Sequence, residues 1–289
     1  MYKKFGVFFV CLCCVLVGVM FVCKIYDGNQ AMIKTIVIKD LPINTLYSHR
    51  GLNSFNATIG LLEGENSVPS FILAGKKGYK YLETDIFETK DGKFYCIHDN
   101  ETGTYSDTNI TITDSLSSDV DGVLLNKTIK NANVDDKFKT RAYKIPSLNT
   151  YLEICKQYKM VPVIEIKKLQ NYTTSVDNVI KIVQEYTDTF IIVSFELSYV
   201  LRAKQYNKNI LALYLTPKDN EITKDVVDFY TSNDIGLAVP IDKIKQDVCE
   251  YAFDKGYPVI VWSIDDKKQY LEKYKNWKVW MFGTNSIVL

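Results

Sequence analysis

The two histidines of this 289-residue chain each end a strand-like run, and a charged residue follows each of them. His49 precedes Arg50, and His98 precedes Asp99. Among side chains, histidine has the ordinary pKa closest to neutrality, so such a pair can serve as a general base and a general acid. The alternative is two structural histidines. Because catalytic side chains of α/β barrels lie at the carboxyl ends of strands, we interpret His49 and His98 as a catalytic pair.

Three carboxylates lie on two other strand-like runs. Glu83 and Asp85 are two residues apart, so their side chains share one face of a strand, and Glu165 and Lys167 share a face of another. Flanking Ile and Val residues indicate half-buried positions, and buried carboxylates must be paired or bind a cation. Three carboxylates in one barrel mouth favour a hard divalent ion, Ca²⁺ or Mg²⁺. The alternative is an ion network in which the glutamates pair with Arg50 and Lys167 without a metal.

This set of groups suits a phosphodiester substrate. The cation and the basic side chains of Arg50 and Lys167 would neutralise charge on the phosphate oxygens. One histidine would deprotonate the attacking oxygen, and the other would protonate the leaving alkoxide.

Nine short runs rich in β-branched or aromatic residues predict the strands that position these side chains, and many are separated by amphipathic segments. The runs are Thr45–His49, Tyr81–Phe87, Phe94–His98, Val161–Lys167, Phe190–Phe195, Ile210–Leu215, Ile235–Val239, Val259–Ile264 and Val279–Phe282. This alternation predicts parallel βα units. Helices are expected over Leu148–Tyr158, with Ser147 as the N-cap, and over Val176–Tyr186.

Nine strands are one more than an eight-stranded barrel needs. Only six residues separate the second run from the third, too few for a parallel crossover, and Asp91-Gly92 is a hairpin signal. A hairpin centred on Asp91 would place His98 opposite Thr84, beside the paired acids. We therefore expect a somewhat irregular TIM-type (β/α)8 barrel with one antiparallel excursion.

Residues 44–289 contain no Gly/Ser-rich or Pro-rich break, and their number is usual for one barrel domain. Residues 100–144 are rich in Asn, Asp, Thr and Ser, so we interpret them as an insertion that is either a surface excursion or a lid over the strand ends. The chain has 35 basic and 34 acidic residues. This balance argues against nucleic acid as a partner.

The N-terminal segment predicts a membrane anchor. Residues 5–23 carry no charge and are long enough to cross a bilayer as a helix. Lys3 and Lys4 place residues 1–4 in the cytoplasm and the rest of the chain outside it. A cleaved signal peptide is the alternative, but no small-x-small site follows. We predict a single-pass membrane protein with a connector over residues 24–43 and an extracytoplasmic catalytic domain.

Nine short motifs, taken together, resemble the glycerophosphodiester phosphodiesterase family. In chain order they are His49-Arg50, Glu65-Asn66-Ser67, Glu83-Thr84-Asp85, Asp91-Gly92, His98-Asp99, Ile145-Pro146-Ser147-Leu148, Glu165-Ile166-Lys167, Ser194-Phe195 and Val261-Trp262-Ser263. The resemblance runs from about residue 45 to the C-terminus. It implies a TIM-type barrel and metal-dependent hydrolysis of glycerophosphodiesters to glycerol 3-phosphate and an alcohol. With the barrel outside the cytoplasm, three forms of substrate stay open: a soluble head group, a lipid head group at the membrane, and glycerol phosphate on a surface polymer.

The resemblance also implies roles for single residues. His49 and His98 would be the acid/base pair, and Glu83, Asp85 and Glu165 would be the metal ligands. The same resemblance assigns four further residues to substrate binding or to its vicinity: Arg50, Lys167, Trp262 and Glu65. The first two would contact the phosphate and the tryptophan would form an apolar wall. The glutamate has an alternative role at a helix entry.

The chain departs from the family pattern in two places. Gly283-Thr284-Asn285-Ser286 stands where an acidic TD motif is usual, and the Arg-Thr pair that commonly follows the second histidine is not recognisable in residues 100–113. Since the core set is intact, we expect an active enzyme. Two other functions stay open: a phospholipase-type lyase that forms a cyclic phosphate, and a non-catalytic surface binding module.

Overall fold

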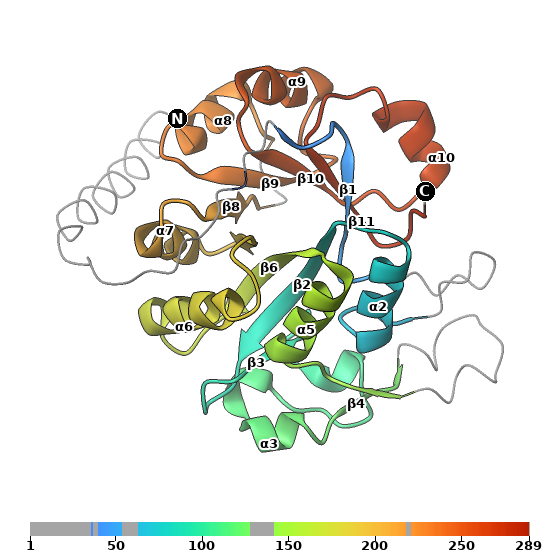
Figure 1. Cartoon of the computed structure of the whole chain (residues 1–289), viewed down its shortest axis with the longest axis vertical. Helices are drawn as coiled ribbons and strands as arrows, with labels where there is room; N and C mark the ends of the chain where they lie inside the picture. Colours follow the sequence, from blue (N-terminus) through green and yellow to red (C-terminus); the bar gives the residue numbers. More distant parts are fainter. Residues whose placement is uncertain (1–35, 37–39, 54–62, 128–141, 218–220, 289) are drawn as a thin grey trace, which may run out of the picture. The chain divides into compact units, whose positions relative to one another are not determined.

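Nine strands of the described chain form one sheet, and eight of them close into a parallel barrel (Figure 1). The computed structural model describes residues 36, 40–53, 63–127, 142–217 and 221–288. The barrel strands are β1 (Thr45–Ser48), β2 (Tyr81–Glu88), β6 (Val161–Lys168), β7 (Ile191–Ser194), β8 (Leu211–Leu215), β9 (Gly236–Pro240), β10 (Val259–Trp262) and β11 (Met281–Thr284). Closure occurs at Ser48, which pairs in parallel with both Thr284 and Leu82. The predicted TIM-type barrel is confirmed.

The ninth strand, β3 (Phe94–Cys96), is the antiparallel excursion that the sequence predicts. Its pairs with β2 are Ile86↔Cys96, Phe87↔Tyr95 and Glu88↔Phe94. Each pair is symmetric about Asp91, so the predicted register is confirmed. The strand ends two residues before His98, which therefore lies in the segment that follows β3 and not within the strand.

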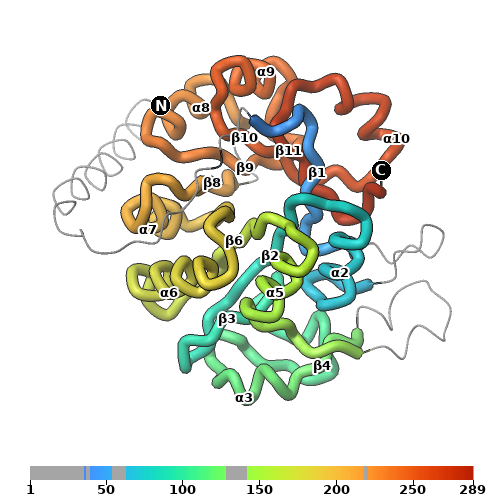
Figure 2. Tube along the Cα trace, viewed as in Figure 1, coloured from blue at the N-terminus to red at the C-terminus, as the bar shows by residue number. Residues whose placement is uncertain are grey.

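Helices lie outside the strands and connect successive barrel strands (Figures 1 and 2). They are α2 (Val68–Lys76), α5 (Leu148–Tyr158), α6 (Tyr172–Gln184), α7 (Leu197–Tyr206), α8 (Lys224–Thr231), α9 (Gln246–Lys255) and the short α10 (Lys267–Gln269), which continues as a π-helical turn (Tyr270–Tyr274). The predicted bounds of α5 and its Ser147 cap are confirmed. Helix α6 begins four residues before the predicted start, because the Asn171 side chain caps it by accepting from two backbone N–H groups.

Alternate residues of the barrel strands face opposite sides, and this alternation separates the core from the site. On β2, Leu82 and Ile86 pack outward against Phe71 and Tyr151 of the helices, all fully buried. Glu83 and Asp85, which alternate with them, point into the barrel. A second apolar cluster fills the barrel interior, and it contains Tyr47, Val163, Ile191, Val193, Leu213, Leu215, Ala238, Ile260, Trp280 and Met281. Because successive residues of a strand face opposite sides, β2 directs its acids into the barrel and its apolar residues against the outer helices.

The described part of the insertion, residues 100–127 and 142–144, is packed rather than extended. It contains two 3-10 turns (Thr102–Thr104 and Ile112–Asp114), helix α3 (Ser117–Val120) and strands β4 (Leu124–Leu125) and β5 (Tyr143–Lys144), which pair with each other. Its apolar cluster joins Phe87 of β2 and Tyr95 of β3 to residues that follow these strands: Ile97, Tyr105, Ile112, Val120, Val123, Leu125 and Ile145. The insertion is thus anchored beside β3, and a lid function stays a prediction.

The predicted membrane anchor, residues 5–23, lies outside the described residues, as do residues 1–4. Within the residues that the structure describes, no helix is both long and apolar enough to span a bilayer. The anchor and the orientation that it implies therefore stay predictions.

Candidate active site

The predicted site residues come together around one cavity of about 410 Å³ at the carboxyl ends of the barrel strands. Those that line it are His49, Arg50, Glu83, His98, Glu165, Lys167 and Trp262. Asp85 is fully buried and contacts two of them. The two histidines, which follow different strands, therefore border the same space.

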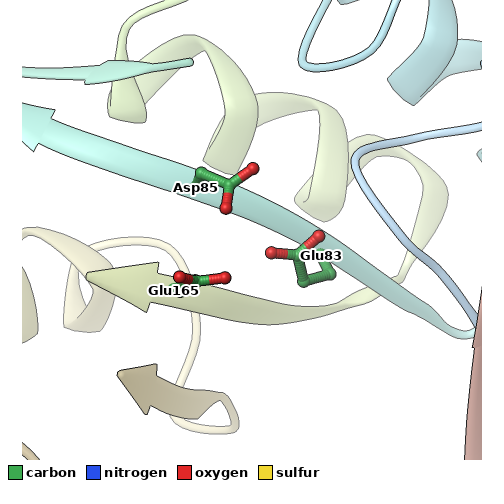
Figure 3. Close-up of side chains that lie close together, drawn as sticks. All are labelled: Glu83, Asp85 and Glu165. Carbon is green, nitrogen blue, oxygen red and sulfur yellow. The ribbon is translucent and has the colours of Figure 1, made fainter. Parts of the chain in front are cut away.

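Three buried carboxylates meet beside this cavity (Figure 3). Asp85 stands directly opposite Glu165 in the parallel register of β2 and β6, and Glu83 precedes Asp85 by two residues on the same face. One oxygen from each of the three lies within 4.8 Å of the others. The Oε1 atom of Glu83 is buried and has no hydrogen-bond partner among the described residues. A buried, unsatisfied, all-oxygen donor set fits a hard divalent cation such as Ca²⁺ or Mg²⁺.

Two basic side chains also reach the carboxylates, as the metal-free alternative requires. Lys167 Nζ lies 3.0 Å from Asp85 Oδ1 and 2.5 Å from Glu165 Oε1, and Arg50 Nε lies 3.3 Å from Asp85 Oδ2. Two cations face three acids, and Arg50 is shared with a fourth acid, Glu65. The ion network therefore leaves negative charge that a divalent cation would offset.

The pKa values of the acids show the same competition for charge. Burial, reinforced by the charge of Asp85, raises the pKa of Glu83 and of Glu165. Burial also opposes ionisation of Asp85, but Lys167 and Arg50 together lower its pKa below the usual range. A cation at this point would favour the ionised form of all three acids.

Residues that follow β1 and precede α2 hold the acids in place. The backbone N–H of Arg50, a residue in the left-handed conformation (φ 56°), donates to Glu83 Oε2 at 2.8 Å. The Asn66 side chain donates to Asp85 Oδ2 at 2.8 Å and accepts from Thr84 Oγ1 at 2.7 Å. Sequence reasoning did not assign Asn66 a site role, although its motif was visible.

Glu65 contacts the site, and its alternative role at the helix entry is not observed. Its Oε2 atom lies 3.2 Å from Arg50 Nη1, and its Oε1 atom accepts from the Tyr105 hydroxyl at 3.0 Å. Helix α2 is instead capped by reciprocal hydrogen bonds between Ser67 and Ser70. Glu65 therefore connects the insertion to the arginine beside the acids.

His49 has a partner that the sequence analysis missed. Its Nδ1 atom lies 2.8 Å from Oδ1 of Asn285, which occupies the position of the absent family acid. The Asn285 side chain donates in turn to Asp265 Oδ2 at 2.8 Å. Burial, followed by the charge of Arg50, lowers the pKa of His49 to about 4. Both partners follow barrel strands, β10 and β11, so the strand-end rule could have indicated them.

His98 is held by its own neighbour, since its Nδ1 atom lies 2.7 Å from Asp99 Oδ1. The contact restrains the ring through Nδ1 and leaves Nε2 available to a reactant.

Aromatic side chains line the cavity beside these polar groups. The Trp262 ring stacks on His49 with 6.3 Å between ring centroids, and Phe195 meets Trp262 edge-on at 6.4 Å. The Phe195 ring also lies 5.7 Å from Lys167 Nζ. The remaining apolar lining is formed by Tyr47, Val163, Val193, Leu215, Ala238 and Ile260. Trp262 and Phe195 thus both line the cavity, and the role of Trp262 as an apolar wall for the substrate stays a prediction.

A family model, described as the glycerophosphoryl diester phosphodiesterase family, matches residues 49–288 of this chain. The chain belongs to this family. The match covers the barrel from the first histidine to the last strand, so the resemblance seen in the short motifs is confirmed. The protein is accordingly a phosphoric diester hydrolase.

Solved structures of the family share this fold. The chain is similar to a phosphodiesterase of Oleispira antarctica, in complex with the product sn-glycerol-3-phosphate, with 18% identity, a TM-score of 0.69 and coverage of 84% of this chain and 93% of that one. A glycerophosphodiester phosphodiesterase of Parabacteroides distasonis has 18% identity, a TM-score of 0.65 and coverage of 84% and 92%. The corresponding enzyme of Agrobacterium tumefaciens has 20% identity, a TM-score of 0.64 and coverage of 84% and 97%. At these identities the likeness concerns the fold.

Proposed function

We propose that this protein hydrolyses glycerophosphodiesters to glycerol 3-phosphate and an alcohol, with a divalent cation and a pair of histidines. The observation that carries the proposal is the meeting of three buried acids, two basic side chains and both histidines of the chain at one end of a closed barrel. The product bound to the Oleispira antarctica phosphodiesterase supports the choice of substrate class.

Each group of the site has a part in this reaction. Arg50 and Lys167 would bind the phosphate oxygens and neutralise their charge. One histidine takes the proton of the attacking water as the new P–O bond forms, and the other gives a proton to the alkoxide as the old P–O bond breaks. Glu83, Asp85 and Glu165 would hold a Ca²⁺ or Mg²⁺ ion, which supplies Lewis-acid polarisation of the phosphate when bound.

The place of action is also part of the proposal. We propose that residues 5–23 anchor the protein in a membrane with the barrel outside the cytoplasm, because Lys3 and Lys4 precede an uncharged segment of spanning length. The substrate would then be a soluble head group, a membrane lipid or a surface polymer that contains glycerol phosphate. Protease added to intact cells should degrade the barrel, and protection of the barrel there would contradict this orientation.

Phosphorus NMR of the products tests the chemistry. The full chain is incubated with glycerophosphocholine after exhaustive chelation, and then with Ca²⁺ or Mg²⁺ restored. We expect glycerol 3-phosphate only when a metal is present, and activity that survives chelation would contradict the metal role. A cyclic phosphate would identify a lyase, and no turnover with either ion would favour a binding module. Asp85→Asn should be inactive, whereas Asp254→Asn, a change at an exposed acid, is the matched control.

A further inference from the structure

We infer that Asn285 and Asp265 are positioning residues that hold His49 with its proton on Nδ1, so that Nε2 is the general base of the reaction. Neither residue touches the three acids of the proposed metal site in the contacts described above. The inference rests on the proposed function for its catalytic meaning, but the arrangement of protons can be tested without turnover.

The carboxylate of Asp265 decides which way the Asn285 amide faces. An ionised carboxylate only accepts hydrogen bonds, so the atom of Asn285 that lies 2.8 Å from Asp265 Oδ2 must be the amide nitrogen. The amide oxygen then faces His49. The Nδ2 atom of Asn53 lies 3.4 Å from the same oxygen and agrees with this orientation, because an amide nitrogen only donates. Its hydrogen bonds to the carbonyls of His49 and Gly51, both 3.0 Å, orient the Asn53 amide itself.

An amide oxygen that faces His49 decides the tautomer of the ring. Because Asn285 Oδ1 can only accept, the Nδ1 atom of His49, 2.8 Å away, must carry the proton. The lone pair of the neutral ring is then on Nε2. A base at Nε2 can take the proton of the attacking water without any change in the Asn285 contact. The acid of the pair is consequently His98.

The partner residues are themselves rigidly held, as positioning requires. The backbone N–H of Asn285 donates to Asp265 Oδ1 at 2.6 Å, and the Ser286 hydroxyl donates to the Asp265 carbonyl at 2.7 Å. The backbone N–H of His49 donates to the Thr284 carbonyl at 2.9 Å. The segments that follow β1, β10 and β11 are thereby connected around the closure of the barrel.

The tautomer can be observed directly, because the chain contains only two histidines. Long-range proton–nitrogen NMR correlation of the metal-free full chain at neutral pH should show two rings, and the spectrum of a His98→Gln variant assigns the remaining ring to His49. We expect a protonated Nδ1 and an unprotonated Nε2 for His49. A proton on Nε2 would overturn the inference, whatever the result of the activity assay.

Exchanging the side chains of Asn285 and Asp265 tests how much this pair contributes to kcat. Asn285→Asp places two carboxylates side by side, and Asp265→Asn removes the group that orients the Asn285 amide. We expect each single variant to lower kcat by at least about 10-fold with little change in KM, because the base is misplaced while phosphate binding is intact. The double variant restores a carboxylate–amide pair with the two roles exchanged, so we expect kcat within about threefold of the wild type.

Asp266→Asn is the matched control, since this adjacent acid caps α10 and should leave kcat unchanged. A double variant that is no faster than the singles, with thermal unfolding like that of the wild type, would overturn the positioning role. Single variants as fast as the wild type would do the same. If the wild type hydrolyses no phosphodiester, the proposed function fails, and the NMR experiment still decides the tautomer.

Discussion

Asp85 and Glu165 stand opposite each other in the parallel register of β2 and β6, and the Lys167 ammonium contacts both carboxylates. This single register places acids from two strands at one point of the barrel mouth. The lysine reduces their repulsion without abolishing it, because Glu83 adds a third acid. The three acids that favour metal binding therefore lower the stability of the folded chain when no metal is bound.

Glu83→Gln should separate these two properties. Burial and the neighbouring acids raise the pKa of Glu83. Above pH 4.5, its ordinary pKa, Glu83 therefore ionises more readily in the unfolded chain, and the free energy of unfolding falls as the pH rises. We expect the neutral variant to have a larger free energy of unfolding than the wild type at pH 7 without metal, by at least about 1 kcal/mol. Its metal-dependent activity should be lost. Urea unfolding in chelator measures the first effect, and a less stable variant would contradict the repulsion.

Replacement of either histidine should reduce turnover strongly. His49→Ala and His98→Ala each remove a group that moves a proton, for which the usual loss in kcat is at least about 100-fold. Because Arg50 and Lys167 are retained, KM should change much less. Steady-state kinetics with saturating metal measures both constants. Near-wild-type turnover in one variant would remove that histidine from the mechanism.

The buried position of His49 predicts a dependence of stability on pH. Burial lowers its pKa from 6.5 to about 4, so between these values the unfolded chain takes up a proton that the folded chain does not bind. The free energy of unfolding should therefore fall by up to about 3 kcal/mol as the pH is lowered through this range. The His49→Gln variant should not show the part of this fall that comes from protonation of His49. Urea unfolding of both proteins in metal-free buffers should show their difference shrinking toward pH 4, and a constant difference would refute the prediction.

The hydroxyl of Tyr105 should affect substrate binding through Glu65. Tyr105→Phe removes the hydrogen bond to Glu65 Oε1 and leaves the pairing of Glu65 with Arg50 less restrained. We expect a several-fold rise in KM and a loss of about 1 kcal/mol in stability. The matched control is Tyr143→Phe, which removes a bond from the same insertion to a different acid, Glu63. Equal effects of the two variants on KM would contradict the specific connection to Arg50.

The sequence by itself determined much of the barrel. Each strand of the main sheet lies within two residues of its predicted bounds, because short β-branched runs separated by amphipathic segments are a local signal. The hairpin register also followed from the turn at Asp91 alone. The positions of Glu83, Asp85 and Glu165 were predictable for the same reason, since the pleat of a strand puts alternate residues on one face.

Only the tertiary structure decided what surrounds these residues. The contact between His49 and Asn285 joins residues 236 positions apart, and it exists because β11 closes the barrel against β1. In the sequence, Asn285 stands only as a residue that replaces the acid usual in the family. In the fold it is a hydrogen-bond acceptor oriented by Asp265. Local patterns determine which residues face inward, whereas the closure of the sheet decides which inward residues meet, because that contact depends on distances through space and not along the chain.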